Sequence, residues 1–276
     1  MDRKATARQT VAIMEQGYYE IDSKKVAIRD LLEHSVKESR LLTPEQGAAL
    51  LQAYQQTKHT PKEELPEDYC RVWNGSTVDA ILKLSAEGKQ EIAVLNFASA
   101  KNPGGGFLNG AMAQEESLAA SSCLYKTLTV HKEYYENNRL CQTMMYTDHA
   151  IYSPDVAFFR DGRFQLLTEP VTASVLTLPA VNMGQVRLKG ENVQEAERIM
   201  KRRMKLSLAI FAEQKCRHLI LGAYGCGVFR NDPKQIAAWW KELLETDFSH
   251  TFDQIIFAVL DRSSSQSCIR AFEELF

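Results

Sequence analysis

The chain has 276 residues, of which 45% are hydrophobic and 25% charged, and its formal net charge at pH 7 is -2. This length suffices for one large domain or two small ones with a substantial core. The near-neutral charge argues against general affinity for nucleic acid, which requires a basic surface, and the apolar runs are too short to cross a bilayer.

The N-terminus and the cysteines both predict a cytoplasmic protein. The first ten residues, MDRKATARQT, lack the apolar segment of a signal peptide. The six cysteines show no CxxC pair and no CxH spacing, which disfavours a disulfide framework or a zinc site. The six histidines are equally dispersed. We therefore expect reduced thiols, no metal site and no cofactor.

Residues 1–66 are expected to form a helical and hairpin extension packed on the main domain. Apolar side chains at helical spacing predict a helix over residues 3–16. Two strand-type runs on either side of residues 22–24 indicate a hairpin. A Thr-Pro pair opens the segment 43–56 and is typical of an N-cap and first helical position. The polar segment 57–67 is the best candidate for a connector.

Residues 67–276 alternate strand-type and helix-type segments, which predicts an α/β domain with a mainly parallel or mixed sheet. Strands are expected at RVWNGS (71–76), IAVLNFA (92–98), MMYT (144–147), VTASVLTLPAV (171–181), HLILGAY (218–224) and QIIFAVLD (254–261). Helices are expected at 76–88, from about 111–113 onward, at 191–215, at 233–245 and at the C-terminus.

Two glycine-rich loops follow apolar strands and lead into helices. They are NFASAKNPGGGF after IAVL and GAYGCGVFRNDP after HLIL. Free N–H groups at a helix start, with no Cβ in the way, can cradle a phosphate. Ligands of such sheets bind beyond the carboxyl ends of the strands. Each loop alone is weak evidence of a phosphate site, because neither has the sequence of a Walker loop or of a dinucleotide-binding fingerprint.

The first loop leads to the adjacent carboxylates of Gln114-Glu115-Glu116. Neighbouring glutamates repel each other, so holding them together perturbs at least one pKa. Consecutive helical residues diverge by about 100°, so the two carboxylates cannot do the same job or flank a glycosidic bond from opposite sides. A single carboxyl would serve as acid first and base later. The alternative is an acidic first turn that favours the helix dipole.

Two further features have ordinary explanations. The basic run Lys201-Arg202-Arg203 lies in the predicted helix 191–215 and is expected to be a solvated face. Cys226 lies between glycines, yet no histidine is near it in sequence, so a nucleophilic role is not favoured.

The two loops together resemble a known family. GGGFLNGAMAQEE has the form of the GGG-then-QEE signature of poly(ADP-ribose) glycohydrolases, and the chain looks like the compact bacterial type of that enzyme. The resemblance also takes in STVDAILKL, PAVN (179–182), LGAYGCGVFRNDP and FDQIIFAVLD. It implies a macrodomain-like three-layer sandwich with a mixed central sheet (67–276) and an N-terminal extension (1–66).

The resemblance implies a role for each matching residue. Glu116 would be the catalytic acid/base, and Glu115 would hold ribose hydroxyls. The remaining substrate-binding residues fall on the two loops: Asn102, Gly104, Gly105, Gly106 and Phe107 beside the distal ribose, Gln114 directly before the two glutamates, and Gly225, Cys226, Gly227 and Val228 around the diphosphate. Phe229 would stack on adenine or pack beside the distal ribose.

The implied reaction is hydrolysis of the ribose–ribose acetal, mainly from the chain end, to release ADP-ribose. The leaving hydroxyl needs a proton from a carboxylic acid of raised pKa, and the arriving water then needs a base; no metal is required. Poly(ADP-ribose) or ADP-ribosylated protein would be the substrate, with no membrane and no sequence-specific nucleic acid as partner. Open alternatives are a non-catalytic ADP-ribose reader, a hydrolase of another ADP-ribosyl linkage, and a nucleotide-binding protein of unrelated fold.

Overall fold

The computed structural model describes residues 2–56 and 69–276, so the predicted connector at 57–67 lies outside the described residues. The strands are β1 (Tyr18–Ile21), β2 (Lys24–Ala27), β3 (Arg40–Leu42), β4 (Cys70–Trp73), β5 (Ile92–Phe97), β6 (Ala150–Arg160), β7 (Leu166–Leu178), β8 (His218–Leu221) and β9 (Gln254–Ala258). Seven of them form one sheet in the order β3-β6-β7-β5-β8-β9-β4.

The sheet is mixed, as expected. Neighbours from β7 through β5, β8 and β9 to β4 pair in parallel. β6 runs antiparallel to β7, and β3 runs antiparallel to β6. The carboxyl ends of β5, β7 and β8 therefore meet at one edge of the sheet, where both glycine-rich loops begin.

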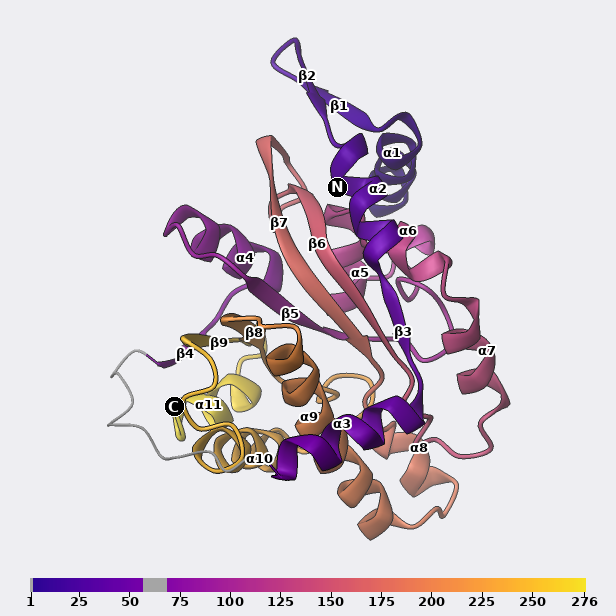
Figure 1. The fold of residues 1–276 in the computed structure, drawn as a ribbon, viewed down its shortest axis with the longest axis vertical. Helices are drawn as coiled ribbons and strands as arrows, with labels where there is room; N and C mark the ends of the chain where they lie inside the picture. The colour runs from indigo at the N-terminus through magenta and orange to yellow at the C-terminus, as the bar shows by residue number, and fades with distance from the viewer. Residues whose placement is uncertain (1, 57–68) are drawn as a thin grey trace.

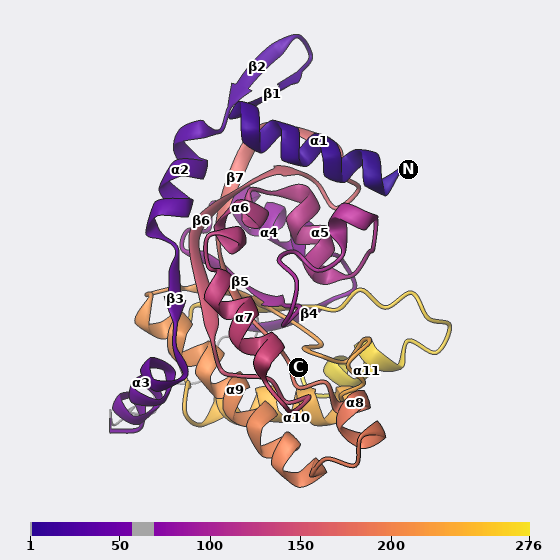
Figure 2. The same ribbon diagram turned by 90° about the vertical axis from the view of Figure 1, so that its right-hand side faces the viewer.

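Helices cover both faces of the sheet (Figures 1 and 2). They are α1 (Arg3–Gln16), α2 (Arg29–Glu38), α3 (Pro44–Gln56), α4 (Thr77–Ala86), α5 (Gln114–Ser121), α6 (Leu124–Thr129), α7 (Lys132–Leu140), α8 (Met183–Leu188), α9 (Val193–Glu213), α10 (Pro233–Glu245) and α11 (Ser267–Glu273), with a 3-10 turn, η1, at Phe107–Asn109.

The alternation of side chains along β5 explains the layers. Val94 points into a core formed with α2, α4, α5 and α6, whereas Ala93 and Leu95 join a second core with α9 and α10. All three side chains are fully buried. Burying a large aliphatic side chain stabilises the fold by roughly 1.5–3 kcal/mol, so a continuous apolar strand requires a helical layer on each side. The predicted three-layer α/β sandwich is confirmed.

Helix ends lie where their capping residues predict them. The Asp232 side chain caps α10 by accepting a hydrogen bond from the Lys234 N–H, and Pro233 is the first helical residue. Thr43 and Gln46 cap α3 reciprocally, each side chain accepting from the other's N–H.

The N-terminal segment contains the predicted hairpin and also joins the main sheet. Asp22 and Ser23 adopt left-handed φ angles of 50° and 61° in the tight turn between β1 and β2, and this hairpin projects from one end of the molecule (Figure 1). β3 is an edge strand of the central sheet. α1 packs across η1 and α5 (Figure 2), and Thr10 donates a hydrogen bond to the Ala120 carbonyl at 2.6 Å.

Two expectations are wrong in detail, and the long strand β6 is not among those expected. The stretch 144–147 (MMYT) is irregular rather than a strand, because its carbonyls hydrogen-bond to the Arg203 side chain and to the Asn182 N–H rather than to a neighbouring strand. In β6, Pro154 and Asp155 are residue types that favour turns, yet here they form a bulge with a register shift between Ser153 and Val156. Arg203 is not on a solvated face but is 1% exposed.

Candidate active site

The two glycine-rich loops leave neighbouring strands. β5 and β8 pair in parallel, so their carboxyl ends lie together. The first loop runs from β5 through η1 to α5, and the second runs from β8 to α10. Near the starts of the loops, the rings of Phe97 and Tyr224 lie 5.6 Å apart, centroid to centroid. The structure therefore brings the two predicted loops together at one edge of the sheet.

Glu116 ties the first turn of α5 to the glycine loop. Its Oε2 accepts a hydrogen bond from the Ala113 N–H at 3.0 Å, and its Oε1 accepts one from the Gly106 N–H at 3.0 Å. A carboxylate in the first turn is also favoured by the helix dipole. Glu116 thus caps the first turn of α5, which is the alternative role that the sequence left open. The same two hydrogen bonds fix the orientation of its half-buried carboxylate.

Glu115 turns the other way, into the protein, and is 3% exposed. It accepts hydrogen bonds from the Ser99 N–H at 2.6 Å and from the Asn96 side-chain amide at 3.3 Å. Burial raises the pKa of Glu115 to about 8; these hydrogen bonds oppose the shift, and the nearby Glu116 carboxylate adds to it. The two carboxylates therefore differ in environment, and burial favours the protonated form of Glu115.

Gly105 lies directly against both carboxylates. Its φ is +60°, in the left-handed region, and a Cβ at this position would collide with Glu116 Oε1 and lie 3.1 Å from Glu115 Oε2. Gly104 also has a left-handed φ of +65°. The consecutive glycines are thus required at least in part by the close approach of the loop to the carboxylates.

Two expected binding residues use their side chains within the protein. The Gln114 amide accepts a hydrogen bond from the Phe97 N–H at 2.9 Å and donates one to the Leu95 carbonyl at 2.8 Å, which docks α5 on the end of β5. Phe107 is 2% exposed and packs edge-on against Tyr125 at 5.0 Å. A ligand would therefore meet Phe107 through its backbone. Asn102, by contrast, is exposed.

The second loop is anchored at its start and open at its tip. Gly225 has a φ of +74°, and a Cβ there would lie 2.6 Å from the Asn231 amide nitrogen. That buried amide donates hydrogen bonds to the Gly225 and Val181 carbonyls at 3.0 and 2.9 Å. A Cβ on Gly227 would meet nothing within 4 Å, and Val228 is 86% exposed. The tip of the loop thus presents backbone to solvent.

Cys226 is unsuited to nucleophilic chemistry. A side-chain hydrogen bond with Cys268, together with burial, raises the pKa of the Cys226 thiol. The nucleophile is the thiolate, which a raised pKa disfavours. The expectation that Cys226 is not a nucleophile agrees with this environment.

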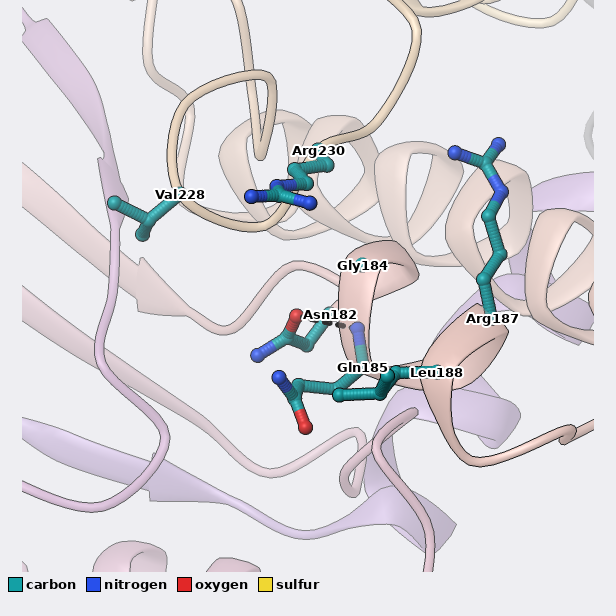
Figure 3. A pocket seen from close by; sticks show the side chains of 7 residues that line it. All are labelled: Asn182, Gly184, Gln185, Arg187, Leu188, Val228 and Arg230. Atoms are coloured by element: carbon teal, nitrogen blue, oxygen red, sulfur yellow. Dashed lines mark hydrogen bonds between the residues drawn. The ribbon is translucent and has the colours of Figure 1, made fainter.

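A cavity of about 550 Å³ opens between the second loop and α8 (Figure 3). Its side chains come from both elements: Asn182, Gln185, Arg187 and Leu188 on one side, Val228 and Arg230 on the other. Of the substrate-binding residues expected from the sequence, Val228 lines it. Neither Glu115 nor Glu116 is among the residues that line this cavity.

Within residues 2–56 and 69–276, no group of three or more His, Cys, Asp or Glu side chains is arranged to hold a metal ion. None of the helices in this part of the chain is long and apolar enough to cross a membrane.

Several residues that shape the site were not identified from the sequence. Asn96 lies in the apolar run of β5, and a polar residue in a buried strand was an available signal. Ser99 supplies the shortest hydrogen bond to Glu115 through its backbone, which no side-chain pattern could predict. Tyr146 contacts the ring of Phe229 with centroids 6.0 Å apart, and it lies 83 positions away in the chain.

The chain is similar to proteins of one family. Residues 7–161 match the model of the family described as microbial-type PARG, catalytic domain. A poly(ADP-ribose) glycohydrolase (PARG) from Thermomonospora curvata is 38% identical, with 99% of each chain covered and a TM-score of 0.93. The same enzyme bound to the inhibitor ADP-HPD gives a TM-score of 0.90 at 38% identity and the same coverage.

A second structure comes from another organism. The PARG from Deinococcus radiodurans in complex with ADP-ribose is 41% identical over 88% of this chain and 96% of that chain, with a TM-score of 0.81. No curated protein sequence matches the chain. On the family match and on identities near 40%, this chain belongs to the microbial-type poly(ADP-ribose) glycohydrolase family.

Proposed function

We propose that the protein is a poly(ADP-ribose) glycohydrolase that cleaves ribose–ribose O-glycosidic bonds and releases ADP-ribose. The observation that carries the proposal is the carboxylate pair held against a glycine loop: Glu116 accepts from the Gly106 N–H, and a Cβ on Gly105 would collide with it. A protein that only bound ADP-ribose would have no need for a carboxylic acid at this place. Family membership supports the same activity.

Glu116 is proposed as the acid/base. It would protonate the leaving ribose oxygen as the glycosidic bond breaks, and an oxocarbenium-like centre would develop at the anomeric carbon. The same carboxylate would then take a proton from the attacking water, which restores the acid. The backbone N–H groups of Gly106 and Ala113 would keep its oxygens in place through both steps.

Glu115 is proposed to hold ribose hydroxyls. In its protonated form it can donate a hydrogen bond as well as accept one, and burial favours that form, with a pKa of about 8. Its position 3.1 Å from a hypothetical Cβ on Gly105 places it at the same loop as Glu116.

The second loop is proposed to bind the diphosphate through its backbone, with Phe229 beside the nucleoside. The open tip at Gly227 leaves room for close approach. The adjoining cavity of about 550 Å³ is within the usual size of small-molecule sites, and Arg187 and Arg230 on its wall suit an anionic ligand. On the first loop, Asn102 is exposed and would hydrogen-bond the distal ribose.

Four finer statements accompany this proposal. The enzyme would act mainly from the chain end, it would be cytoplasmic, and it would need no sequence-specific nucleic acid. Residues 1–66 would be an extension and 67–276 the catalytic domain. The end-acting mode is tested by a time course on long, protein-attached polymer, because early free oligomers would contradict it.

The activity itself is tested by incubating the protein with poly(ADP-ribose) and, in parallel, with mono-ADP-ribosylated protein, and by measuring free ADP-ribose chromatographically. The proposal predicts release from the polymer. Release only from the mono-ADP-ribosylated protein would identify a hydrolase of a different linkage. Binding of ADP-ribose without release from either substrate would identify a reader.

A further inference from the structure

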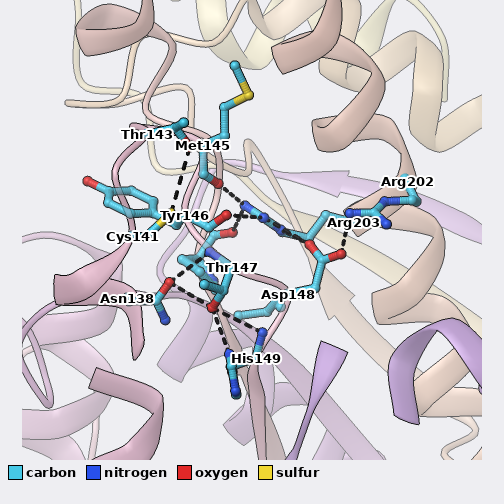
Figure 4. A network of polar contacts seen from close by, with 12 residues as sticks. Asn138, Cys141, Thr143, Met145, Tyr146, Thr147, Asp148, His149, Arg202 and Arg203 are labelled. Atoms are coloured by element: carbon cyan, nitrogen blue, oxygen red, sulfur yellow. Dashed lines mark hydrogen bonds and ion pairs between the residues drawn. The ribbon is translucent and has the colours of Figure 1, made fainter. Parts of the chain in front are cut away.

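Arg203 of α9 is the centre of a buried polar network that the proposed chemistry does not use (Figure 4). The side chain is 1% exposed and points at the irregular segment 141–149, which connects α7 to β6. Its ion-pair partner, Asp148, is also largely buried, with a side-chain exposure of 11%. Burying an ion pair costs desolvation energy, so the burial of this pair is weak evidence that it stabilises the fold. The position of the pair therefore needs another explanation.

The guanidinium uses all five of its N–H donors on this segment and on the end of β7. Nε and Nη2 donate to Asp148 Oδ1 at 3.0 and 2.9 Å. Nη1 donates to the carbonyls of Met145 and Pro179, each at 2.9 Å. Nη2 also lies 3.5 Å from the Tyr146 carbonyl. Only arginine offers five donors in a fixed planar arrangement, so Arg203 determines the path of the segment.

The segment held in this way carries Tyr146 to the second loop. Tyr146 has a left-handed φ of 60°, which is uncommon for a residue other than glycine and persists where the surroundings enforce it. Its ring contacts Phe229, and both side chains are half-buried. The neighbouring Met144 carbonyl accepts a hydrogen bond from the Asn182 N–H at 3.0 Å, beside the cavity at α8.

We infer that Arg203 and Asp148 are positioning residues for ligand binding: they hold Tyr146 against Phe229, so that the two rings form one aromatic wall for the nucleoside end of ADP-ribose. This inference rests on the proposed function. Arg203 contacts no ligand itself; it acts through the conformation of Tyr146. Tyr146 is thereby assigned as a nucleoside-binding residue in its own right.

A double-mutant cycle tests the inference. The variants are Arg203→Lys, which keeps the charge but loses two donors, Tyr146→Ala, and the two combined. For each, the dissociation constant of ADP-ribose is measured by calorimetry and turnover is measured at saturating polymer. Each single substitution should weaken binding about tenfold, the typical effect of removing one aromatic contact with a base, with little change in turnover at saturation.

The combined variant should bind no more weakly than either single variant, because Arg203→Lys already removes the contribution of Tyr146 to binding. Arg202→Lys is the matched control. Arg202 also pairs with Asp148 but is 42% exposed and contacts no carbonyl of the segment, so binding should be unchanged.

Additive losses of ADP-ribose affinity in the combined variant would overturn the inference. So would an Arg203→Lys variant that binds ADP-ribose normally but unfolds at a lower temperature, because Arg203 would then be purely structural. Should Arg203→Lys fail to fold, Asp148→Asn takes its place in the cycle under the same criteria. Wild-type protein that does not bind ADP-ribose at all would overturn the proposed function and this inference together. Wild-type binding with additive losses would overturn the inference alone.

Discussion

The two glycine-rich loops leave adjacent strands, yet they are built in opposite ways. In the first loop, side chains are held in place: Glu115 is buried, Glu116 has a backbone donor on each oxygen, and Gly105 packs directly against both. In the second loop the tip is open, with space around Gly227 and 86% exposure at Val228.

This difference suggests a division of labour. Proton transfer requires a carboxyl group fixed at one position, because small displacements are costly to the rate. Gripping a diphosphate requires accessible backbone N–H groups and little else. We therefore expect the first loop to carry the chemistry and the second loop to carry binding, and each prediction below would break or sharpen that contrast.

Glu116→Gln should have the largest effect. It keeps the shape of the side chain and removes the titratable proton, so turnover should fall by about 10²–10⁴-fold, the usual contribution of general acid–base catalysis. Binding of ADP-ribose should change little, since only the transition state needs the proton. Turnover close to that of the wild type would contradict the assignment.

Gly105→Ala compares directly with Gly227→Ala. The added methyl at position 105 would collide with the Glu116 carboxylate in a left-handed backbone, whereas at position 227 it would meet nothing within 4 Å. A displacement of about 1 Å in a catalytic group can cost about 10²-fold in rate, so Gly105→Ala should lose roughly that much. Gly227→Ala should retain its rate; equal losses in the two variants would remove the contrast between the loops.

Phe229→Ala should weaken binding of ADP-ribose by about 1–3 kcal/mol, the range found where aromatic contacts with bases have been removed. Turnover at saturation should be nearly unchanged, because the ring lies on the binding loop. Calorimetry with ADP-ribose measures the first effect. An unaltered dissociation constant would show that Phe229 serves the core alone.

The buried Glu115 predicts a pH effect. If its protonated form holds the ribose, activity should decline as the pH rises through about 8, the pKa that burial gives it, by roughly tenfold per unit above that point. Because the folded pKa is raised, the stability that protonated Glu115 contributes is fully present below about pH 4.5 and is lost as the pH rises to about 8, since the unfolded state ionises first. Glu115→Gln should abolish the pH dependence of activity and the pH dependence of stability. If activity in this variant still declines at alkaline pH, the decline belongs to another titrating group.

The smallest expected effect is that of a chelator. The sequence has no clustered metal-ligating side chains, and the proposed mechanism assigns both proton transfers to Glu116. Activity after dialysis against EDTA should therefore equal that before. Complete loss, restored by one divalent ion, would require a different account of the first loop.

Much of the fold could be predicted from local patterns. The apolar run of β5, the cap and proline that open α10, and the glycine loops all depend on neighbouring residues, and they lie where expected. The bulged strand β6 could not be predicted, because Pro154 and Asp155 imitate a turn and only pairing with β7 keeps the strand extended.

The sequence predicts a set of candidate site residues, but it does not predict the environment of each one. Glu115 and Glu116 are adjacent in sequence, and only the folded protein distinguishes the buried one from the one bound to the loop. Arg203 belongs to a run of basic residues that is typical of a solvated face, yet its partners lie on a segment about 55 positions earlier. Such long-range contacts leave no local signal.

The division of labour between the loops is tested most directly by comparing Glu116→Gln with Phe229→Ala. For each, the dissociation constant of ADP-ribose and the single-turnover rate on poly(ADP-ribose) would be measured under the same conditions. Glu116→Gln should lose the rate and keep the affinity, and Phe229→Ala should lose affinity and keep the rate. A fall in both quantities in both variants would contradict the account, because the two loops would then act as one undivided site.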